Sequence, residues 1–201
     1  MGSRGTIRSM NTLHRWYCSS ERWRATVGGK LLPWVLRGAE LGDDVLEIGP
    51  GPGITTDVLR ARVPRLTSVE IDARLAAALQ QRLHGTNVRV VHGDATRLEL
   101  PDASFSGAIA CTMLHHVPSP ALQDRLLAEV RRVLRPGGIF VGSDSLSSLL
   151  FRLVHVRDTL VPVDPNGFAA RLERAGFVYP EVRVSGRSFR WRATAALRAP
   201  G

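Results

Sequence analysis

The stretch 45–56, VLEIGPGPGITT, constrains the fold of this chain more than any other part of the sequence. A short apolar run leads into Gly49, Gly51 and Gly53, which alternate with two prolines. This pattern predicts a buried strand, a tight turn and the start of a helix. Glycine allows positive φ angles and a close approach of the backbone, and the first N–H groups of a helix attract anions. The turn is therefore suited to hold a ligand.

The spacing of these glycines distinguishes between two classes of ligand. Turns that bind dinucleotides have the pattern G-x-G-x-x-G and hold a pyrophosphate. The pattern here is E-x-G-x-G-x-G, with Glu47 before the first glycine. A carboxylate at this position repels pyrophosphate and favours an ammonium or sulfonium group. The spacing therefore argues against a nicotinamide dehydrogenase.

Predicted strands alternate with predicted helices along the rest of the chain. Apolar runs predict further strands at 65–70, 87–92, 105–111 and 139–143. Helices are predicted from Asp72, from Ser119-Pro120 to a stop at Pro136-Gly137-Gly138, and over 167–177, before a C-terminal hairpin. This order predicts an α/β fold with a doubly wound, mostly parallel, Rossmann-like sheet and helices on both faces. Ligands bind such sheets at the carboxyl ends of the strands, which is where the candidate residues of this chain fall.

The composition narrows the cellular context. A length of 201 residues suits one domain, and no apolar run approaches the roughly 20 residues of a membrane span. Cys18 and Cys111 show neither metal-binding nor disulfide spacing, so we expect a cytoplasmic protein without a metal. The net charge of +9 leaves nucleic acid and anionic substrates open as partners. Because arginines occur in every predicted element, an ordinary solvated basic surface is the simpler interpretation.

Five motifs between Leu41 and Phe177 resemble those of class I S-adenosylmethionine-dependent methyltransferases, of the type 11 group that includes ubiquinone/menaquinone-biosynthesis methyltransferases. The motifs are VLEIGPGPG, SVEID, GDATRLELPDASF, LHHV and LRPGGIF. The resemblance implies S-adenosyl-L-methionine as cofactor and a seven-stranded sheet whose last strand is antiparallel. We expect residues 1–10 to form a disordered extension, 11–40 to form helices that cover the site, and 41–201 to form the cofactor-binding methyltransferase domain.

The resemblance also implies a role for each cofactor-binding residue. Glu70 accepts hydrogen bonds from both ribose hydroxyls, since a carboxylate offers two acceptor oxygens; a surface acid is the alternative. Asp94 with Ala95 meets the adenine amino group, and a cap for the turn 95–98 is the alternative. The residues assigned to the cofactor are Glu47, Gly49, Gly51, Gly53, Glu70, Asp94, Ala95, Cys111 and Thr112.

Two departures from the family pattern lie in and before the fourth strand. Ser106-Gly107 stands where the family usually has an acid after the phenylalanine. Cys111-Thr112 stands where related enzymes often carry small polar residues, and Cys111 is also readable as a small buried hydrophobe. Neither departure touches the glycine turn. The second one bears on the acceptor side of the site.

The acceptor and any general base are less constrained. His115, His116 and Asp144 follow strands at the right edge and are the candidate catalytic bases, with His155 and Asp158 as further candidates; a structural role is the alternative for each histidine. Base-methylating enzymes carry an Asn/Asp/Ser-Pro-Pro-aromatic motif after this strand, and the chain has CTML instead. The apolar stretch 149–154 suggests a lipophilic acceptor, or else a helix packed on the sheet. We therefore expect a small-molecule or lipophilic acceptor, with an RNA methyltransferase or nucleic-acid-binding protein as the alternative.

Overall fold

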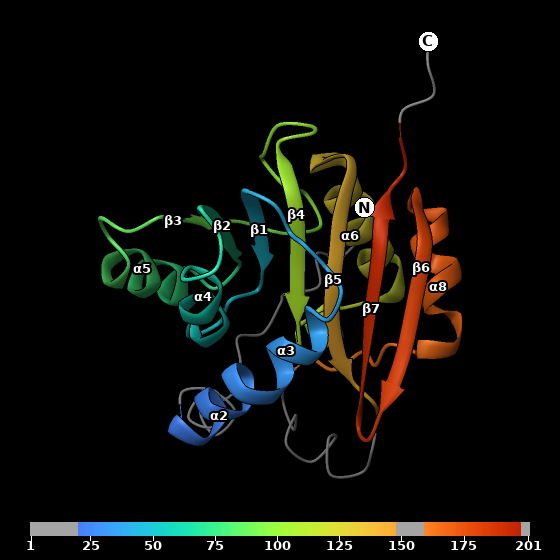
Figure 1. The fold of residues 1–201 in the computed structure, drawn as a ribbon, viewed down its shortest axis with the longest axis horizontal. Helices are drawn as coiled ribbons and strands as arrows, with labels where there is room; N and C mark the ends of the chain where they lie inside the picture. The colour runs from blue at the N-terminus through green and yellow to red at the C-terminus, as the bar shows by residue number, and fades with distance from the viewer. Residues whose placement is uncertain (1–19, 148–158, 198–201) are drawn as a thin grey trace, which may run out of the picture.

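A seven-stranded sheet forms the centre of the computed structural model, which describes residues 20–147 and 159–197. The strand order is β3-β2-β1-β4-β5-β7-β6, and β7 is antiparallel to both of its neighbours (Figure 1). The strands are β1 (Asp44–Ile48), β2 (Arg65–Glu70), β3 (Val88–His92), β4 (Phe105–Cys111), β5 (Leu134–Ser145), β6 (Phe177–Ser185) and β7 (Ser188–Ala195). The helices are α2 (Glu21–Thr26), the π-helix η1 (Val27–Leu31), α3 (Leu32–Val35), α4 (Ile54–Leu59), α5 (Ala73–Arg82), the 3-10 helix η2 (Leu114–His116), α6 (Pro120–Val133) and α8 (Pro165–Arg174).

The predicted α/β fold is confirmed, and so are the local signals that start its helices. The side chain of Asp72 accepts hydrogen bonds from two N–H groups of α5, and that of Ser119 accepts one from Leu122 in α6. One boundary was wrong. The Pro136-Gly137-Gly138 stretch lies inside β5 instead of forming a turn before it, because the strand already begins where Leu134 pairs with Phe105.

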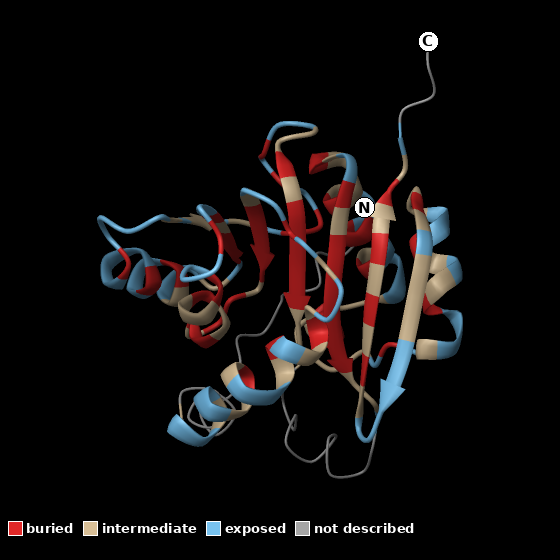
Figure 2. Ribbon diagram, viewed as in Figure 1, coloured by how far each residue is buried: buried red, intermediate tan, exposed pale blue. Residues whose placement is uncertain are grey.

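The sheet separates two hydrophobic cores. On one face, Val45, Ile109 and Val141 pack against the N-terminal helices and α4. On the other face, Phe140 and Trp191 pack with residues of α6 and α8. Figure 2 shows buried residues concentrated along β1, β4, β5 and β7. Because side chains alternate along a strand, each strand presents its odd and even positions to different cores.

The carboxyl ends of β1, β4 and β5 meet at one edge of the sheet, which is the lower edge in Figure 1. The helices α2 and α3 lie in front of this edge, and the turn between β6 and β7 reaches the same side. The site that the sequence predicts at the strand ends therefore has walls from the N-terminal helices and from the hairpin. No helix in the described ranges combines the length and the apolar character that a membrane crossing needs.

Close packing at Gly142 sets the spacing of the strands just before this edge. A Cβ atom there would lie 2.2 Å from the carbonyl oxygen of Ala110 and 2.2 Å from Cζ2 of Trp191. Neither the backbone nor a fully buried tryptophan can move away at low cost. Only glycine therefore fits at position 142, between the neighbouring strands β4 and β7.

We expect Gly142→Ala to lower the free energy of unfolding by about 3 kcal/mol, as overpacked cores do. Gly167→Ala in α8 is the matched control, since a Cβ there has nothing within 4 Å, and it should be neutral or slightly stabilising. Urea unfolding midpoints measure both. Equal midpoints for the two variants would contradict this account of β5.

Candidate active site at the carboxyl edge of the sheet

The glycine turn after β1 has the backbone conformation that the sequence predicts. Gly49, Gly51 and Gly53 have φ angles of 66°, 56° and 88°. At Gly53, which precedes α4, a Cβ atom would lie 2.3 Å from Cδ1 of Leu79, so both the φ angle and the space exclude a larger residue. The N–H of Gly49 donates to the carbonyl oxygen of Val69 at 2.9 Å, which ties the turn to β2.

Glu47 lies beneath the turn and is only 2% exposed. Its Oε2 accepts hydrogen bonds from the hydroxyls of Thr56 and Ser68, each at 2.7 Å. Its Oε1 is buried without a hydrogen-bond partner among the described residues. Burial raises the pKa of Glu47 to about 7, against the lowering effect of the two hydroxyls. One oxygen of this carboxyl group is therefore left for a donor that arrives from outside the protein.

Glu70, at the end of β2, connects two loops. Its Oε2 accepts the N–H of Gly51 and its Oε1 accepts the N–H of Asp72, both at 2.9 Å. The side chain is largely buried, and burial raises its pKa. A carboxylate has about four lone-pair positions, so each oxygen can accept one more hydrogen bond. The surface-acid alternative for Glu70 was therefore wrong.

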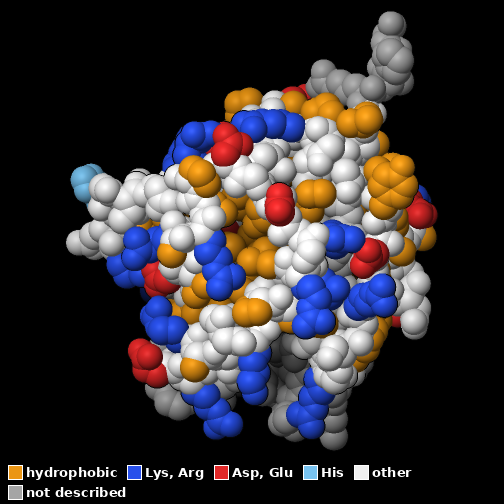
Figure 3. Space-filling view, in the orientation of Figure 1, with side chains coloured by type: hydrophobic (Ala, Val, Ile, Leu, Met, Phe, Trp, Pro, Cys, Tyr) orange, Lys and Arg blue, Asp and Glu red, His pale blue; other side chains and the backbone are white. Residues whose placement is uncertain are grey.

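An apolar pocket opens beside the glycine turn and encloses about 440 Å³, part of it open to solvent. Ile71 and Met113 line it, and so do Asp94 and Ala95 after β3. Oδ1 of Asp94 accepts the N–H of Thr96 at 2.8 Å, so this residue caps the turn as well as bordering the pocket. The two interpretations of Asp94 are therefore compatible. Figure 3 shows the other face of the molecule, on which α2 and α3 lie, where hydrophobic side chains are exposed in a hollow with basic ones around it.

Cys111 and Thr112 end β4 close to this turn. Burial raises the pKa of the Cys111 thiol to about 12, so the side chain is a neutral thiol near pH 7. Thr112 has a φ angle of 51°, which is rare for a β-branched residue and costs free energy. Its N–H donates to the carbonyl oxygen of Ser143 at 2.7 Å. The strained backbone redirects the chain exactly at the edge where the candidate residues gather.

The structure brings His115 and Asp144 together on the face of α6 and α8. Nδ1 of His115 lies 2.5 Å from Oδ1 of Asp144, and its backbone N–H donates to Oδ2 at 3.0 Å. Both residues are buried, so this pair fastens the segment after β4 to β5. His116 is half-buried, stacks against His115 with ring centroids 4.1 Å apart, and lines the apolar pocket. The further candidates His155 and Asp158, and the stretch 149–154, lie outside the described residues.

Comparisons with known proteins agree with this geometry. Residues 46–142 match a family model described as "Methyltransferase domain". An uncharacterized methyltransferase of Mycobacterium bovis is 32% identical over 94 residues, 47% of this chain and 46% of the relative. A probable ribosomal RNA small subunit methyltransferase A of Thermococcus kodakarensis is 34% identical over 98 residues, 48% of this chain and 34% of the relative. The chain thus spans half or less of the length of these relatives.

A solved structure extends the similarity over most of the chain. It is an N-methyltransferase from Bradyrhizobium japonicum in complex with S-adenosyl-L-homocysteine, with a TM-score of 0.71 at 16% identity, covering 92% of this chain and 93% of that one. The seven-stranded order, the glycine turn and the family match therefore agree. Residues 46–142 thus match the methyltransferase-domain family, and the chain has the fold of this N-methyltransferase.

The residues of this site fit S-adenosyl-L-methionine, the methyl donor of the matched methyltransferase-domain family, in their chemistry. The unpartnered Oε1 of Glu47 can accept from a cationic amino group, and Glu70 can accept from two hydroxyls. The apolar pocket suits a flat base, with the exposed carboxylate of Asp94 at its rim. No group of three or more His, Cys, Asp or Glu residues in the described ranges could hold a metal ion.

Sequence reasoning missed the residues that support the candidate site. Thr56 and Ser68 hold Glu47 from two other elements, and the signal for Ser68 was a polar residue at a buried strand position. Ser106, noted as a departure, receives the N–H of Asp44 at 3.0 Å and donates to Leu41 at 2.7 Å. A Cβ at the adjacent Gly107 would lie 2.5 Å from the Leu41 carbonyl oxygen. This departure therefore fastens β4 to the start of β1.

The raised pKa of Glu47 makes stability depend on pH. Between about 4.5, its ordinary pKa, and about 7, the folded protein holds a proton that the unfolded chain has lost. The free energy of unfolding therefore falls as pH rises through this window, by roughly 3 kcal/mol in total. We expect Glu47→Gln to remove this fall in the free energy of unfolding. The stability of the variant relative to the natural protein should therefore increase as the pH rises from 5 to 8. Urea unfolding across that range measures it.

Glu99→Gln, at an exposed acid, is the control for removing one negative charge. A constant stability difference between Glu47→Gln and the natural protein from pH 5 to pH 8 would show that Glu47 is not protonated in the folded state.

Proposed function

We propose that this protein transfers a methyl group from S-adenosyl-L-methionine to a small-molecule or lipophilic acceptor. One observation carries the proposal: a glycine turn with three positive φ angles lies between two buried carboxyl groups, Glu47 and Glu70, next to an apolar pocket. S-adenosyl-L-methionine, a cationic amino acid attached to a nucleoside, matches the carboxyl groups, the glycine turn and the apolar pocket. The cytoplasm is the proposed compartment, since isolated cysteines suit a reducing environment.

The residues of the chain act mainly by positioning. The cofactor supplies an electrophilic methyl group on a sulfonium, and its sulfur takes the bonding electron pair as the acceptor's lone pair forms the new bond to carbon. Glu47 would hold the amino end, Glu70 the ribose, and Asp94 with Ala95 the adenine. Holding reactants in line contributes about 7–11 kcal/mol to catalysis. Cys111 and Thr112, at the end of β4, would border the reacting centre.

A general base is needed only if the acceptor must lose a proton. Of the three candidates, His116 is the one with a half-buried side chain, while His115 and Asp144 are buried and held against each other in the core. We therefore propose His116 as the base if one acts, and His115 with Asp144 as the pair that positions it.

An RNA acceptor is the alternative, which the Thermococcus kodakarensis relative and the charge of +9 favour. Against it stands the CTML stretch at 111–114, which has neither the prolines nor the stacking ring of the base-methylating motif. S-adenosyl-L-methionine with a labelled methyl group distinguishes an RNA acceptor from a small-molecule or lipophilic one. With cell extract as the source of acceptors, we expect label in a small-molecule or solvent-soluble fraction that resists ribonuclease. Label in a large, ribonuclease-sensitive fraction would favour the alternative.

We expect Glu70→Ala to weaken the binding of S-adenosylhomocysteine by about ten- to a hundredfold, because it removes charge-assisted hydrogen bonds. Isothermal titration calorimetry measures the dissociation constant. Asp72→Asn is the neighbouring control; asparagine also caps helices, so affinity should change little. Glu70→Gln keeps one acceptor oxygen, so its affinity for S-adenosylhomocysteine should lie between those of Glu70→Ala and Asp72→Asn. If Glu70→Ala bound as tightly as the natural protein, the ribose assignment would be wrong.

A further inference from the structure

A row of residues crosses the sheet from the proposed methyl-transfer centre to its outer strands. Cys111 pairs with Ser143 on β5, Ser143 with Arg190 on β7, and Arg190 with Arg183 on β6. Neighbouring strands lie about 4.8 Å apart, so the Cα atoms of Cys111 and Arg190 are roughly 10 Å apart. This is the span of a small acceptor with its reactive atom at one end.

The row lies on the face that the N-terminal helices cover. Phe189 and Trp191 belong to the core on the opposite face, so Arg190 between them points away from that core. Its Nη1 donates to the carbonyl oxygen of Arg37 at 3.4 Å, just beyond α3. Arg192 donates to the next carbonyl, that of Gly38. The end of α3 therefore lies directly over β7.

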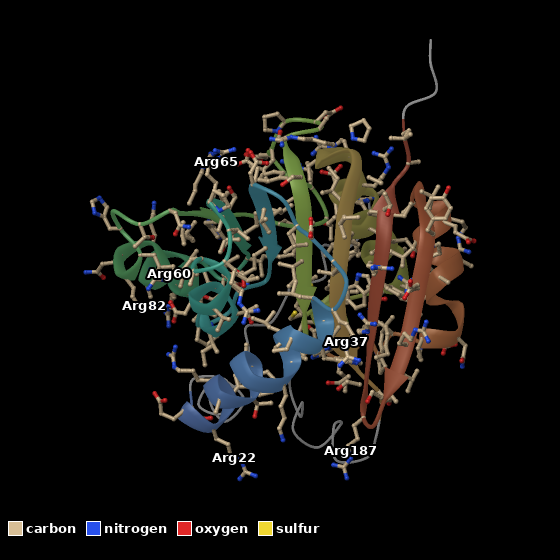
Figure 4. The ribbon with its side chains drawn as sticks, in the orientation of Figure 1. Arg22, Arg37, Arg60, Arg65, Arg82 and Arg187 are labelled. Atoms are coloured by element: carbon tan, nitrogen blue, oxygen red, sulfur yellow. The ribbon has the colours of Figure 1, made fainter. Side chains whose placement is uncertain are left out.

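Four arginines gather here with a single acid. Among the described residues, Glu181 is the only carboxylate that pairs with any of them, at 2.7 Å to Arg192 and 3.8 Å to Arg183. Figure 3 shows basic side chains over this part of the sheet, and Figure 4 places Arg37 at the end of α3 and Arg187 beyond the hairpin turn. The four arginines, called the arginine cluster below, are Arg37, Arg183, Arg190 and Arg192.

The cluster repels itself. Partial burial lowers the pKa of Arg190, and the nearby charges of Arg37, Arg183 and Arg192 lower it further, against the single opposing effect of Glu181. Between Cys111 and Arg190, the hydroxyl of Ser143 is fully buried and faces the Cys111 thiol, whose pKa it lowers against the larger raising effect of burial. An anion bound beside Arg190 would relieve this repulsion.

We infer that the methyl acceptor carries an oxyanion, a carboxylate or a phosphate ester, which Arg190 and Arg183 bind while its reactive atom lies at the end of β4, beside Cys111. Guanidinium groups match both kinds of oxyanion because they donate two parallel hydrogen bonds. Arg37 approaches from α3 and gives the site a second wall. This inference rests on the proposed function and narrows the class of its acceptor.

The distribution of charge favours a small anion over a nucleic acid. Away from the cluster, many arginines are already paired: Arg82 and Arg24 with Asp57, and Arg65 with Asp43 and Asp44. Arg132 and Arg171 likewise pair with acids near them. A nucleic acid needs basic groups spread along its backbone to follow successive phosphates. The arginines of the cluster instead lie together beside the site.

Inorganic phosphate tests the anion site without turnover. We expect the Nε–Hε NMR signals of Arg190 and Arg183 to shift saturably with millimolar phosphate in protein saturated with S-adenosylhomocysteine, relative to sodium chloride of equal ionic strength. Arg190→Met should weaken this binding at least tenfold. Arg183→Met, at an exposed position, should weaken it without risk to the fold, and Arg74→Met on the outside of α5 is the matched control. Signals that respond equally to phosphate and chloride would overturn the inference.

The charge of the labelled product tests the acceptor. We expect the product made from cell extract to be small and retained by an anion exchanger at pH 7, and its yield to fall at least tenfold in Arg190→Met but not in Arg74→Met. A neutral product, or equal yields, would overturn the inference and leave the proposed function standing. A ribonuclease-sensitive product would replace the small acceptor by RNA. Phosphate binding at Arg190 with no labelled product under any condition would overturn the proposed function, with only the anion site remaining.

Discussion

The burial of two carboxyl groups beneath one glycine turn is the constraint on which the rest of the site depends. Removing a carboxylate from water is costly unless hydrogen bonds compensate it. Glu70 is compensated by backbone N–H groups of Gly51 and Asp72, so its burial fixes the turn and the start of α5 together. Glu47 is compensated on one oxygen only, by Thr56 and Ser68. The carboxyl group of Glu70 therefore stabilises the fold, and Oε1 of Glu47 is left to bind a ligand.

The alternation of side chains along β5 separates two kinds of chemistry that are adjacent in sequence. Asp144 faces the α6 core, where it holds the backbone and the ring of His115. Ser143, one residue earlier, faces the N-terminal helices in a row with Cys111 and Arg190. A register slip of one residue would exchange these faces and destroy both arrangements. The tight fit at Gly142 prevents this slip, because only glycine fits between Ala110 and Trp191.

The sequence was informative where a feature is local and less so where it depends on register. The glycine turn, the caps at Asp72 and Ser119, and the order of strands all follow from residues within a few positions of each other. The support of Glu47 requires Ser68, which is 21 residues away and becomes a neighbour only through the pairing of β1 with β2. The start of β5 depends in the same way on the pairing of Leu134 with Phe105, which outweighs the local turn signal of Pro136-Gly137-Gly138. The arginine cluster was hidden as well, since its members come from a helix end and two strands.

The polarity of the carboxyl edge gives the two halves of the site opposite preferences. Acids lie toward β2, where Glu47, Glu70 and Asp94 surround the glycine turn, and arginines lie toward β6. A cationic donor and an anionic acceptor would each find the matching half, and their reacting atoms would meet over Cys111, whose thiol is neutral. Like charges placed in the wrong half would be repelled, which gives orientation before any contact is made. The overall charge of +9 says little about function by itself, because the place of the arginine cluster at the β6 end of the site gives that charge its consequence.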